Sequence, residues 1–494
     1  MKHRRLTAAL IVLFCPAAVG LLAARELPPS VPSPQPPHVP APVVRTLPNG
    51  LKIAVIERPG LPIITLTLAI RTGSEADPPE LPGTAQLAAS LLNEGAAHLT
   101  AARIASLIDG AGGTISTGAD WDDSYATLSV LRSYTPLAFD LLSGIVIHPK
   151  FAPQEVERIR KQTLSALDIL RHDPGYLADT LIERMAFEGT SYAHPADGVE
   201  GSVRRITPQD LRAFHSRYYQ PANAVLVVSG DVQTAQALDL AERTFGGWQG
   251  SGPPVAPSVK PSQPSRSRQI VVIDDPDAVQ TEIRVANPAI GRDSPDYDAL
   301  SVANQILGGP AENLLFSALR SRRGLVYGAS SNLVCYRSAG AWESQTATST
   351  DTTLETVRLM LDQMKRLRHR ALGGEDLRMA QDYLIGHMAL QFDTSDQIAG
   401  RVLDLMIYNL PLNTWNLFPQ KIRQLTRSEV LQATRRYLHP SRAVIVLVGN
   451  ATGFKQNLKK LGRVRIIPMA RVDLAAASLE SPPKPAIGTA SGRD

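Results

Sequence analysis

The chain has 494 residues, of which 44% are hydrophobic and 20% charged, a composition typical of a globular protein with about two to four domains. Its formal net charge is +5, and Lys2, Arg4 and Arg5 contribute three of these positive charges. The rest of the chain has no basic stripe that could neutralise phosphates, which argues against nucleic-acid binding.

The first 24 residues have the layout of a secretory signal peptide. A basic start precedes an apolar run over residues 6–24 that is rich in small side chains. The alternative is a retained membrane anchor, because the run is about long enough to cross a bilayer, but Pro16 and Gly20 interrupt it. We therefore expect a cleaved signal and a periplasmic protein. Residues 25–43 are proline-rich and predict an extended tether.

Cysteine usage excludes a disulfide framework. Removal of the signal leaves Cys335 as the one remaining thiol, and the sequence contains no Cys-rich zinc pattern. Because nothing near Cys335 in the sequence would activate a thiol, we expect it to be a buried apolar residue.

Two bodies of similar size, 44–249 and 269–465, are separated by a linker rich in proline and serine at 250–268. A polar tail at 466–494 is expected to be disordered. Each body opens with strand-like segments, which are followed by helical patterns at 83–95, 101–110, 133–147, 153–172 and 175–187, and at 294–307, 312–321, 352–371, 374–392 and 395–408. The predicted fold class is α/β (α+β), with sheets covered by helices in both bodies.

The two bodies also contain a repeated unit. Residues 206–231 align without a gap with residues 425–450, and both read as a capped helix followed by a β-branched strand. The identical positions are Thr207, Arg217, Tyr218, Pro221, Ala224, Val225, Val227 and Gly230, which match Thr426, Arg436, Tyr437, Pro440, Ala443, Val444, Val446 and Gly449. This agreement indicates an internal duplication.

The segment "NGLKIAVIERPGLPIITLTLAIRTGSEADPPELPGTAQLAASLLNEGA" resembles the N-terminal part of the insulinase/pitrilysin family of zinc peptidases, in particular its processing-peptidase-like members. In that family the helix that starts after the glycine carries the inverted zinc motif H-x-x-E-H. The two histidines bind zinc, the glutamate activates a water molecule, and a later helix provides a third ligand. The resemblance covers both bodies and implies a fold of two homologous halves.

This chain lacks the residues of that motif. The histidine positions fall on Gln86 and Ser90 and the glutamate position on Ala89, while the distal ligand is expected at Ser165 or Ala166. No two histidines lie within five residues of each other, so neither H-x-x-E-H nor H-E-x-x-H occurs anywhere. Because amide and hydroxyl groups are poor zinc ligands, we expect no metal in this chain, and the chain alone is expected to be inactive.

The second body keeps another family element. The stretch "LGGPAENLLFSALRSRRGLVYGASS" resembles the family's glycine loop and the arginine and tyrosine that act near the zinc of the opposite body. The resemblance assigns Arg320 and Tyr327 to substrate binding and oxyanion stabilisation, and Gly308 and Gly309 to the loop where an extended peptide enters. A guanidinium and a phenol are suitable donors toward negative charge. The alternatives are an exposed arginine at a helix end and a tyrosine in a strand pair.

In some members of the family, one subunit carries the zinc motif and its partner carries the arginine and tyrosine. The leading hypothesis is therefore that this chain is the subunit without zinc in a heterodimeric periplasmic metallopeptidase that cleaves peptides, with the zinc in a homologous partner. The main alternative is a catalytically inactive scaffold or peptide-binding subunit of an envelope complex. A third reading, an independent enzyme, is disfavoured because G-x-S-x-G and phosphate-loop motifs are absent; Asp122 and Asp123 are expected in a solvated turn.

Overall fold

The computed structural model describes residues 39–250, 266–310, 312–369 and 373–481. The predicted signal peptide, most of the predicted tether, the interior of the linker and the last part of the predicted tail lie outside these residues. Within the described part of the chain, no helix is both long and apolar enough to cross a membrane.

The first body is built on a six-stranded sheet with the order β1-β2-β6-β3-β5-β4. Its strands are β1 (Val43–Thr46), β2 (Lys52–Glu57), β3 (Ile63–Ile70), β4 (Thr114–Ala119), β5 (Ser124–Leu131) and β6 (Ala224–Gly230). Strands β2 and β6 are parallel, and all other neighbours are antiparallel. Every residue of β6 is buried, as expected for a valine-rich strand that is covered on both faces of its sheet.

The helices of the first body follow the predicted order closely. They are α1 (Thr84–Ser90), α2 (Ala101–Gly110), α3 (Thr135–Ile147), α4 (Pro153–Leu170), α5 (Pro174–Ala186), α6 (Glu200–Val203), α7 (Pro208–Tyr218) and α8 (Thr234–Phe245). Helix α1 is shorter than the predicted 83–95. Its last turn tightens as Leu91 and Leu92 donate to carbonyls three residues back, which ends the α-helical ladder at Ser90.

The second sheet repeats the first. Its order is β12-β7-β11-β8-β10-β9, and the five positions from β7 to β9 have the same sequence of neighbours and the same parallel pair, β7 with β11. The strands are β7 (Gln269–Asp274), β8 (Gln280–Pro288), β9 (Val326–Cys335), β10 (Gly340–Ser349), β11 (Val444–Gly449) and β12 (Arg463–Pro468). This shared topology supports the internal duplication predicted from the repeated unit.

The edge strand β12 corrects the predicted domain end. It pairs in parallel with β7 and so carries the second body past residue 465, where the tail was predicted to begin. The chain stays ordered beyond it, because Val472 forms a bridge with Glu480 and the Leu479 side chain is buried. The composition of the tail is polar overall, so its few apolar residues did not predict a strand or core positions.

The helices of the second body are α9 (Tyr297–Gly308), α10 (Leu314–Phe316), the π-helical turn η4 (Ser317–Ser321), α11 (Thr353–His369), α12 (Gly374–Met388), α13 (Ser395–Ile407), α14 (Thr414–Gln424), α15 (Arg427–Tyr437) and α16 (Lys455–Leu458). The repeated helices α7 and α15 both begin with a capping box, formed by Thr207 with Asp210 and by Thr426 with Glu429. The capping boxes therefore explain why the two helices begin after Thr207 and Thr426, as predicted.

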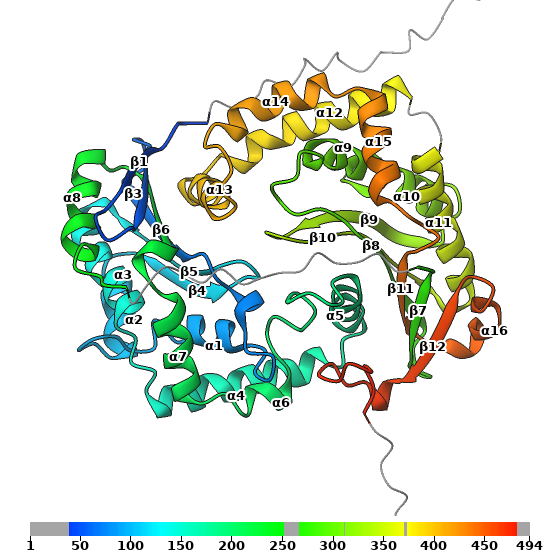
Figure 1. The fold of residues 1–494 in the computed structure, drawn as a ribbon, viewed down its shortest axis with the longest axis horizontal. Helices are drawn as coiled ribbons and strands as arrows, with labels where there is room; N and C mark the ends of the chain where they lie inside the picture. Colours follow the sequence, from blue (N-terminus) through cyan, green and yellow to red (C-terminus); the bar gives the residue numbers. More distant parts are fainter. Residues whose placement is uncertain (1–38, 251–265, 311, 370–372, 482–494) are drawn as a thin grey trace, which may run out of the picture.

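The two bodies exchange a helix with each other. Helix α5 belongs to the first body but packs on β8 and β11, and α13 belongs to the second body but packs on β3 and β6 (Figure 1). Leu177 and Leu181 of α5 are buried in one core cluster with strands of the second sheet. Val402 of α13 is buried in a cluster that contains Val225 and Val227 of β6.

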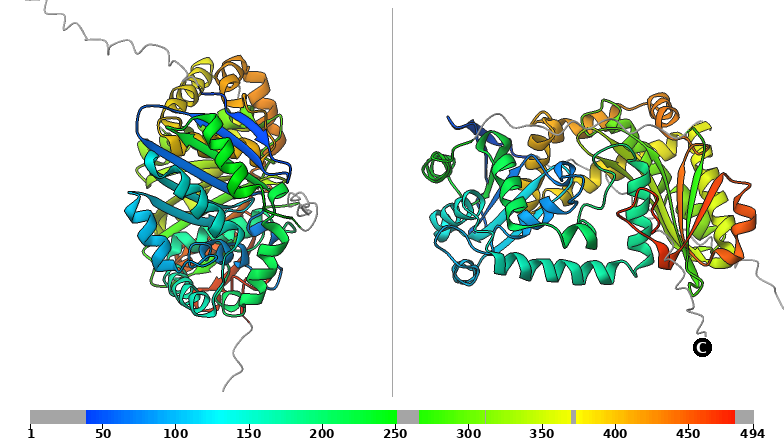
Figure 2. Two further views of the ribbon diagram at one scale, coloured as in Figure 1. Left: turned by 90° about the vertical axis from the view of Figure 1, so that its left-hand side faces the viewer. Right: turned by 60° about the horizontal axis from the view of Figure 1, so that its bottom comes forward.

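Figure 2 shows the two sheets at opposite ends of the molecule, with α4 running along one side toward the second body. Because each sheet has one face covered by a helix of the other body, the hydrophobic core is continuous across the boundary between them.

The turn between β9 and β10 also connects the bodies. Arg337 on this turn forms an ion pair with Glu75, with 3.2 Å between Nη1 and Oε1. Its Nη2 donates to the carbonyl oxygens of Arg71 at 3.2 Å and Asp122 at 2.8 Å. Its backbone N–H donates to the Asp122 carboxylate at 2.7 Å. One arginine from the second body is therefore bonded to two loops of the first.

Candidate functional site

Helix α1 has a well-defined N-terminus at the position where the resemblance puts the zinc helix. Gly83 precedes it with a φ of 93°, and the Asp77 carboxylate accepts hydrogen bonds from the N–H groups of Gly83 at 2.6 Å and Ala85 at 2.7 Å. Burial raises the pKa of Asp77 to about 8, and these backbone donors oppose the rise. The N-terminus of the helix is therefore well capped, although Gln86, Ala89 and Ser90 stand at the positions of the zinc motif.

The three degenerate positions do not fit a zinc ion. Gln86 Oε1 accepts a hydrogen bond of 2.7 Å from the Ala119 N–H at the end of β4, while Ala89 is fully buried and Ser90 is half-buried. Ser165 and Ala166, at the distal-ligand position, are exposed on α4. The part of the chain that the structure describes contains no group of three or more His, Cys, Asp or Glu residues that could hold a metal ion. Helix α1 therefore supports the fold, with Gln86 holding the edge strand β4.

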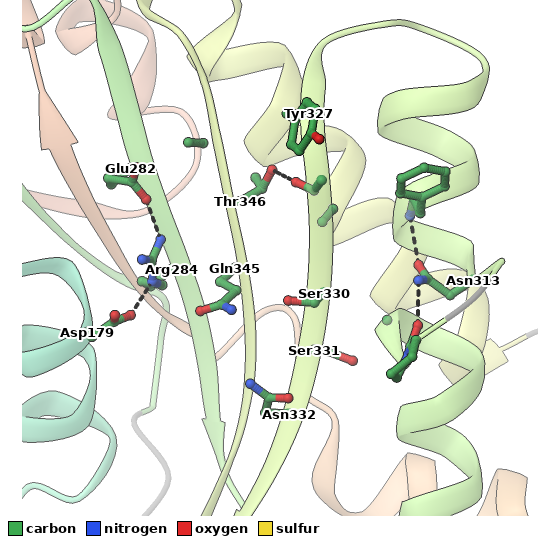
Figure 3. Close-up of a pocket in the computed structure, with 17 residues that line it drawn as sticks. Asp179, Glu282, Arg284, Asn313, Tyr327, Ser330, Ser331, Asn332, Gln345 and Thr346 are labelled. Atoms are coloured by element: carbon green, nitrogen blue, oxygen red, sulfur yellow. Dashed lines mark hydrogen bonds and ion pairs between the residues drawn. The ribbon is translucent and has the colours of Figure 1, made fainter. Parts of the chain in front are cut away.

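A cavity of about 960 Å³ lies along β9 in the second body (Figure 3). One side consists of β9 and the end of α9, and the other is the sheet face formed by β8 and β10 together with α5. Its lining includes Gly308, Gly309, Asn313, Tyr327 and residues 328–332. Within the described chain, β9 has a strand neighbour, β10, on one side, and its other edge is not paired with a strand.

The packing of α9 against β9 requires a glycine at the first position of the predicted glycine loop. A Cβ atom on Gly308 would lie 2.4 Å from the backbone nitrogen of Ser331, so the end of α9 reaches β9 only because this position has no side chain. Asn313 fixes the next turn, since its Oδ1 accepts from the Phe316 N–H at 2.7 Å and its Nδ2 donates to the Gly309 carbonyl at 2.7 Å. Gly308 and Gly309 thus line the cavity and also have a structural role.

The structure brings Arg320 and Tyr327 together. Arg320 lies in the π-helical turn η4, and Gly324, with a φ of 64°, reverses the chain so that it enters β9. Arg320 Nη1 donates to the Val326 carbonyl at 3.1 Å, and its guanidinium carbon lies 5.5 Å from the centre of the Tyr327 ring.

Both members of this pair are exposed. The Tyr327 side chain is 90% exposed, so it does not pack in the sheet as an ordinary strand tyrosine would. Arg320 is also exposed, and Tyr327 lines the cavity along β9.

The charged residues of the cavity were not found from the sequence. Arg284 of β8, with a side chain only 8% exposed, pairs with Asp179 of α5 and with Glu282 at 2.8 Å. The two carboxylates compensate the buried guanidinium charge. Asp179 and Arg284 are far apart in the chain and meet only because α5 packs on the second sheet, so no local pattern could have joined them.

The acidic turn "DWDDS" differs from the solvated turn that its composition predicted. Asp122 is 1% exposed and Asp123 is 9% exposed. The Asp122 carboxylate accepts a hydrogen bond of 2.6 Å from the Tyr192 hydroxyl in addition to the bond from Arg337. The expectation was wrong because the β9–β10 turn of the other body covers these carboxylates.

Cys335, at the end of β9, is half-buried, and burial raises its thiol pKa to about 12. This agrees with the expectation that Cys335 is not a nucleophile.

Comparisons with known proteins agree with this geometry. Residues 52–195 match the family model "Insulinase (Peptidase family M16)" and residues 205–384 match "Peptidase M16 inactive domain". An "Uncharacterized zinc protease" of Mycobacterium leprae is 25% identical over 357 residues, which cover 72% of this chain and 80% of the relative. The "Non-peptidase homolog YmxG" of Helicobacter pylori is 24% identical over 409 residues, which cover 81% and 93%.

A solved structure described as a peptidase M16 inactive domain from Pseudomonas fluorescens superposes with a TM-score of 0.78 at 29% identity, over 83% of this chain and 97% of that one. A protease from Helicobacter pylori superposes with a TM-score of 0.77 at 17% identity, over 83% and 100%, and supports the fold alone. The two matched domains, the repeated sheets and the replaced zinc ligands lead to one conclusion: this chain belongs to the insulinase-like M16 peptidase family, as a member without the family's zinc motif.

Proposed function

We propose that this chain is the subunit without zinc in a heterodimeric envelope peptidase, and that Arg320 and Tyr327 complete the active site of a homologous partner that holds the zinc. The observation that carries the proposal is the exposed Arg320–Tyr327 pair beside an open edge strand, in a chain whose own zinc positions hold no ligands. A signal peptide at residues 1–24 would deliver the chain to the periplasm.

The cavity along β9 suits an extended peptide. A peptide added beside β9 would exchange main-chain hydrogen bonds with the open edge, and its side chains would alternate between the cavity and solvent. Tyr327 at the start of β9 and Arg320 beside it would then donate to the carbonyl oxygen that becomes negatively charged during hydrolysis. The zinc of the partner would supply the activated water.

The test begins with purification from the native envelope. A homologous subunit with an H-x-x-E-H motif should co-purify in equal amount, and metal analysis should find one zinc per complex, held by that subunit. The co-expressed complex should cleave peptides, and Arg320→Ala and Tyr327→Phe should each lower kcat by about 10²- to 10³-fold, the usual effect of removing one oxyanion donor.

Matched controls come from the first body. Arg103→Ala on exposed α2 and Tyr134→Phe, with Tyr134 38% exposed, change the same residue types away from the pair and should leave kcat unchanged. Unchanged peptide turnover in an intact complex with Arg320→Ala and Tyr327→Phe would rule out the shared active site.

The second candidate is a scaffold or peptide-binding subunit without a catalytic role. The observation that favours it is the similarity to a relative named as a non-peptidase homolog. This role predicts that an envelope complex co-purifies without a zinc-motif subunit. It also predicts that peptides bind along β9 and are released uncleaved.

A further inference from the structure

A second cavity, of about 850 Å³, lies between the two bodies, and we refer to it as the seam cavity. It is lined by the turn between β4 and β5, the end of β9, helix α13 and the chain around the end of α5. Both β9 and α13 come from the second body, whereas the β4–β5 turn and α5 come from the first. The seam cavity contains neither Tyr327 nor the glycine loop, so it is distinct from the cavity along β9.

Carboxylates dominate the polar lining of the seam cavity. They are Asp120, Asp122, Asp123, Glu183, Asp197, Asp396 and Asp404. Three of them have clear partners. Asp122 bonds to Tyr192 and Arg337, and Asp404 forms an ion pair with Arg292 at 3.2 Å. Asp396 accepts a hydrogen bond from the Thr65 hydroxyl. The arginines that reach this region are therefore already engaged by structural contacts.

Of the remaining four, Asp120, Asp123, Glu183 and Asp197, Asp123 is the most buried. Its side chain is 9% exposed and lines the seam cavity, yet no hydrogen bond or ion pair from the described residues reaches its carboxylate. Burial and the neighbouring carboxylates Asp120 and Asp122 raise its pKa to about 8. A buried carboxyl group without a partner is kept neutral by protonation, and a bound cation would favour its ionised form.

The rest of the wall favours an organic cation. Tyr125 and Tyr408 line the same cavity as Asp123, together with Trp121 and Tyr336, whose rings also pack on Tyr192. Aromatic faces next to a carboxylate recognise guanidinium and ammonium groups through cation–π contacts and charge-assisted hydrogen bonds. A metal ion fits less well, because within the described residues no three of the acidic side chains converge as ligands.

We propose that the seam cavity binds an organic cation, a guanidinium or alkylammonium group, with the Asp123 carboxylate as its counter-ion. The cation comes either from a free amine or from a basic side chain of a polypeptide. The proposal does not depend on the heterodimer or on peptidase activity, since every residue it uses belongs to this chain. A bound cation would contact both bodies and would stabilise their association.

The test is isothermal titration calorimetry on the purified exported chain. The probes are agmatine and spermidine as free amines, the blocked peptide acetyl-Gly-Arg-Gly-amide, and acetyl-Gly-Gln-Gly-amide as the uncharged control. We expect saturable binding of at least one cationic probe and none of the glutamine peptide. Tighter binding of the amines identifies a small-molecule ligand, and tighter binding of the arginine peptide identifies a polypeptide side chain; both results support the site.

Substitution then connects binding to Asp123. Asp123→Asn should weaken binding of the cation by at least about tenfold, because a charge-assisted hydrogen bond is lost. Asp109→Asn, at the exposed end of α2, is the matched control and should leave the affinity unchanged. Equal affinity in both variants, or no saturable binding of any cationic probe to the wild-type chain, would overturn the proposal.

A measurement on the wild-type chain covers the case in which Asp123→Asn fails to fold. The charged groups that face Asp123 are Asp120 and Asp122 on its own turn, Arg337 from the β9–β10 turn and Asp404 from α13. The titratable hydroxyls of Tyr125, Tyr219 and Tyr408 also lie near it. Since the cation binds the ionised carboxylate, affinity should rise between pH 6 and pH 8 and level off above the pKa of Asp123. An affinity that is constant or falls over this interval would contradict the assigned counter-ion.

Discussion

Leu181→Ala removes a fully buried side chain at the place where α5 of the first body packs on the second sheet. Truncation of a buried leucine costs about 2–5 kcal/mol, depending on how far the surrounding side chains can close the space left behind. We expect a loss of about 3 kcal/mol in the free energy of unfolding, a large part of the roughly 5–15 kcal/mol that stabilises a typical protein. Because α5 and α13 each pack on the sheet of the other body, we expect the full loss of unfolding free energy in both bodies.

Urea denaturation combined with hydrogen exchange measures this coupling. Leu181→Ala should shift a single unfolding transition, and amide protection in β6 and β11 should fall by the same free energy. Ile169→Ala is the control, since this α4 side chain is 74% exposed and its removal should change stability by less than about 0.5 kcal/mol. Two separate transitions, or lost protection in β11 with unchanged protection in β6, would refute the idea of one cooperative unit.

Three further predictions concern single contacts. Gln86→Ala should cost about 1–3 kcal/mol in urea denaturation, because the Ala119 N–H loses its acceptor; an unchanged midpoint would show that the helix–strand contact is dispensable. Asp123 has a folded-state pKa of about 8, above its unfolded value of about 4, so its contribution to stability falls as pH rises from 4 to 8. Asp123→Asn should therefore gain at least about 1 kcal/mol relative to wild type between pH 5 and pH 9 in thermal unfolding, and a gap that stays constant over this range would argue against the raised pKa. Thr207→Ala and Thr426→Ala should each cost about 1 kcal/mol, because each removes one half of an equivalent capping box, and a clear difference between the two losses would show that the repeated helices are not equivalent.

The elements of both bodies could be predicted because their signals are local. Threonine caps, apolar periodicity and β-branched runs lie within single segments, and the repeat of 206–231 at 425–450 showed that one unit occurs twice. The resemblance also led to the Arg320–Tyr327 pair, which the structure brings together.

The contacts between the bodies could not be predicted in this way. The pattern of α5 shows which face is apolar but not which sheet covers it. The ion pair of Glu75 with Arg337 joins residues 262 positions apart in sequence. For the same reason the sequence of "DWDDS" predicted a solvated turn. Its polar composition is a local signal, whereas the turn that covers it comes from the other body.

The exchange of helices also determines when the protein can finish folding. When residue 249 has been synthesised, the face of β6 that includes Val225 and Val227 is still uncovered, because α13 begins only at Ser395. At about 5–20 residues per second, the missing helix arrives roughly 7–30 s later. During this interval an apolar sheet face stays uncovered. Such a delay keeps the first half unable to close early, and it leaves a surface that chaperones can hold until synthesis is complete.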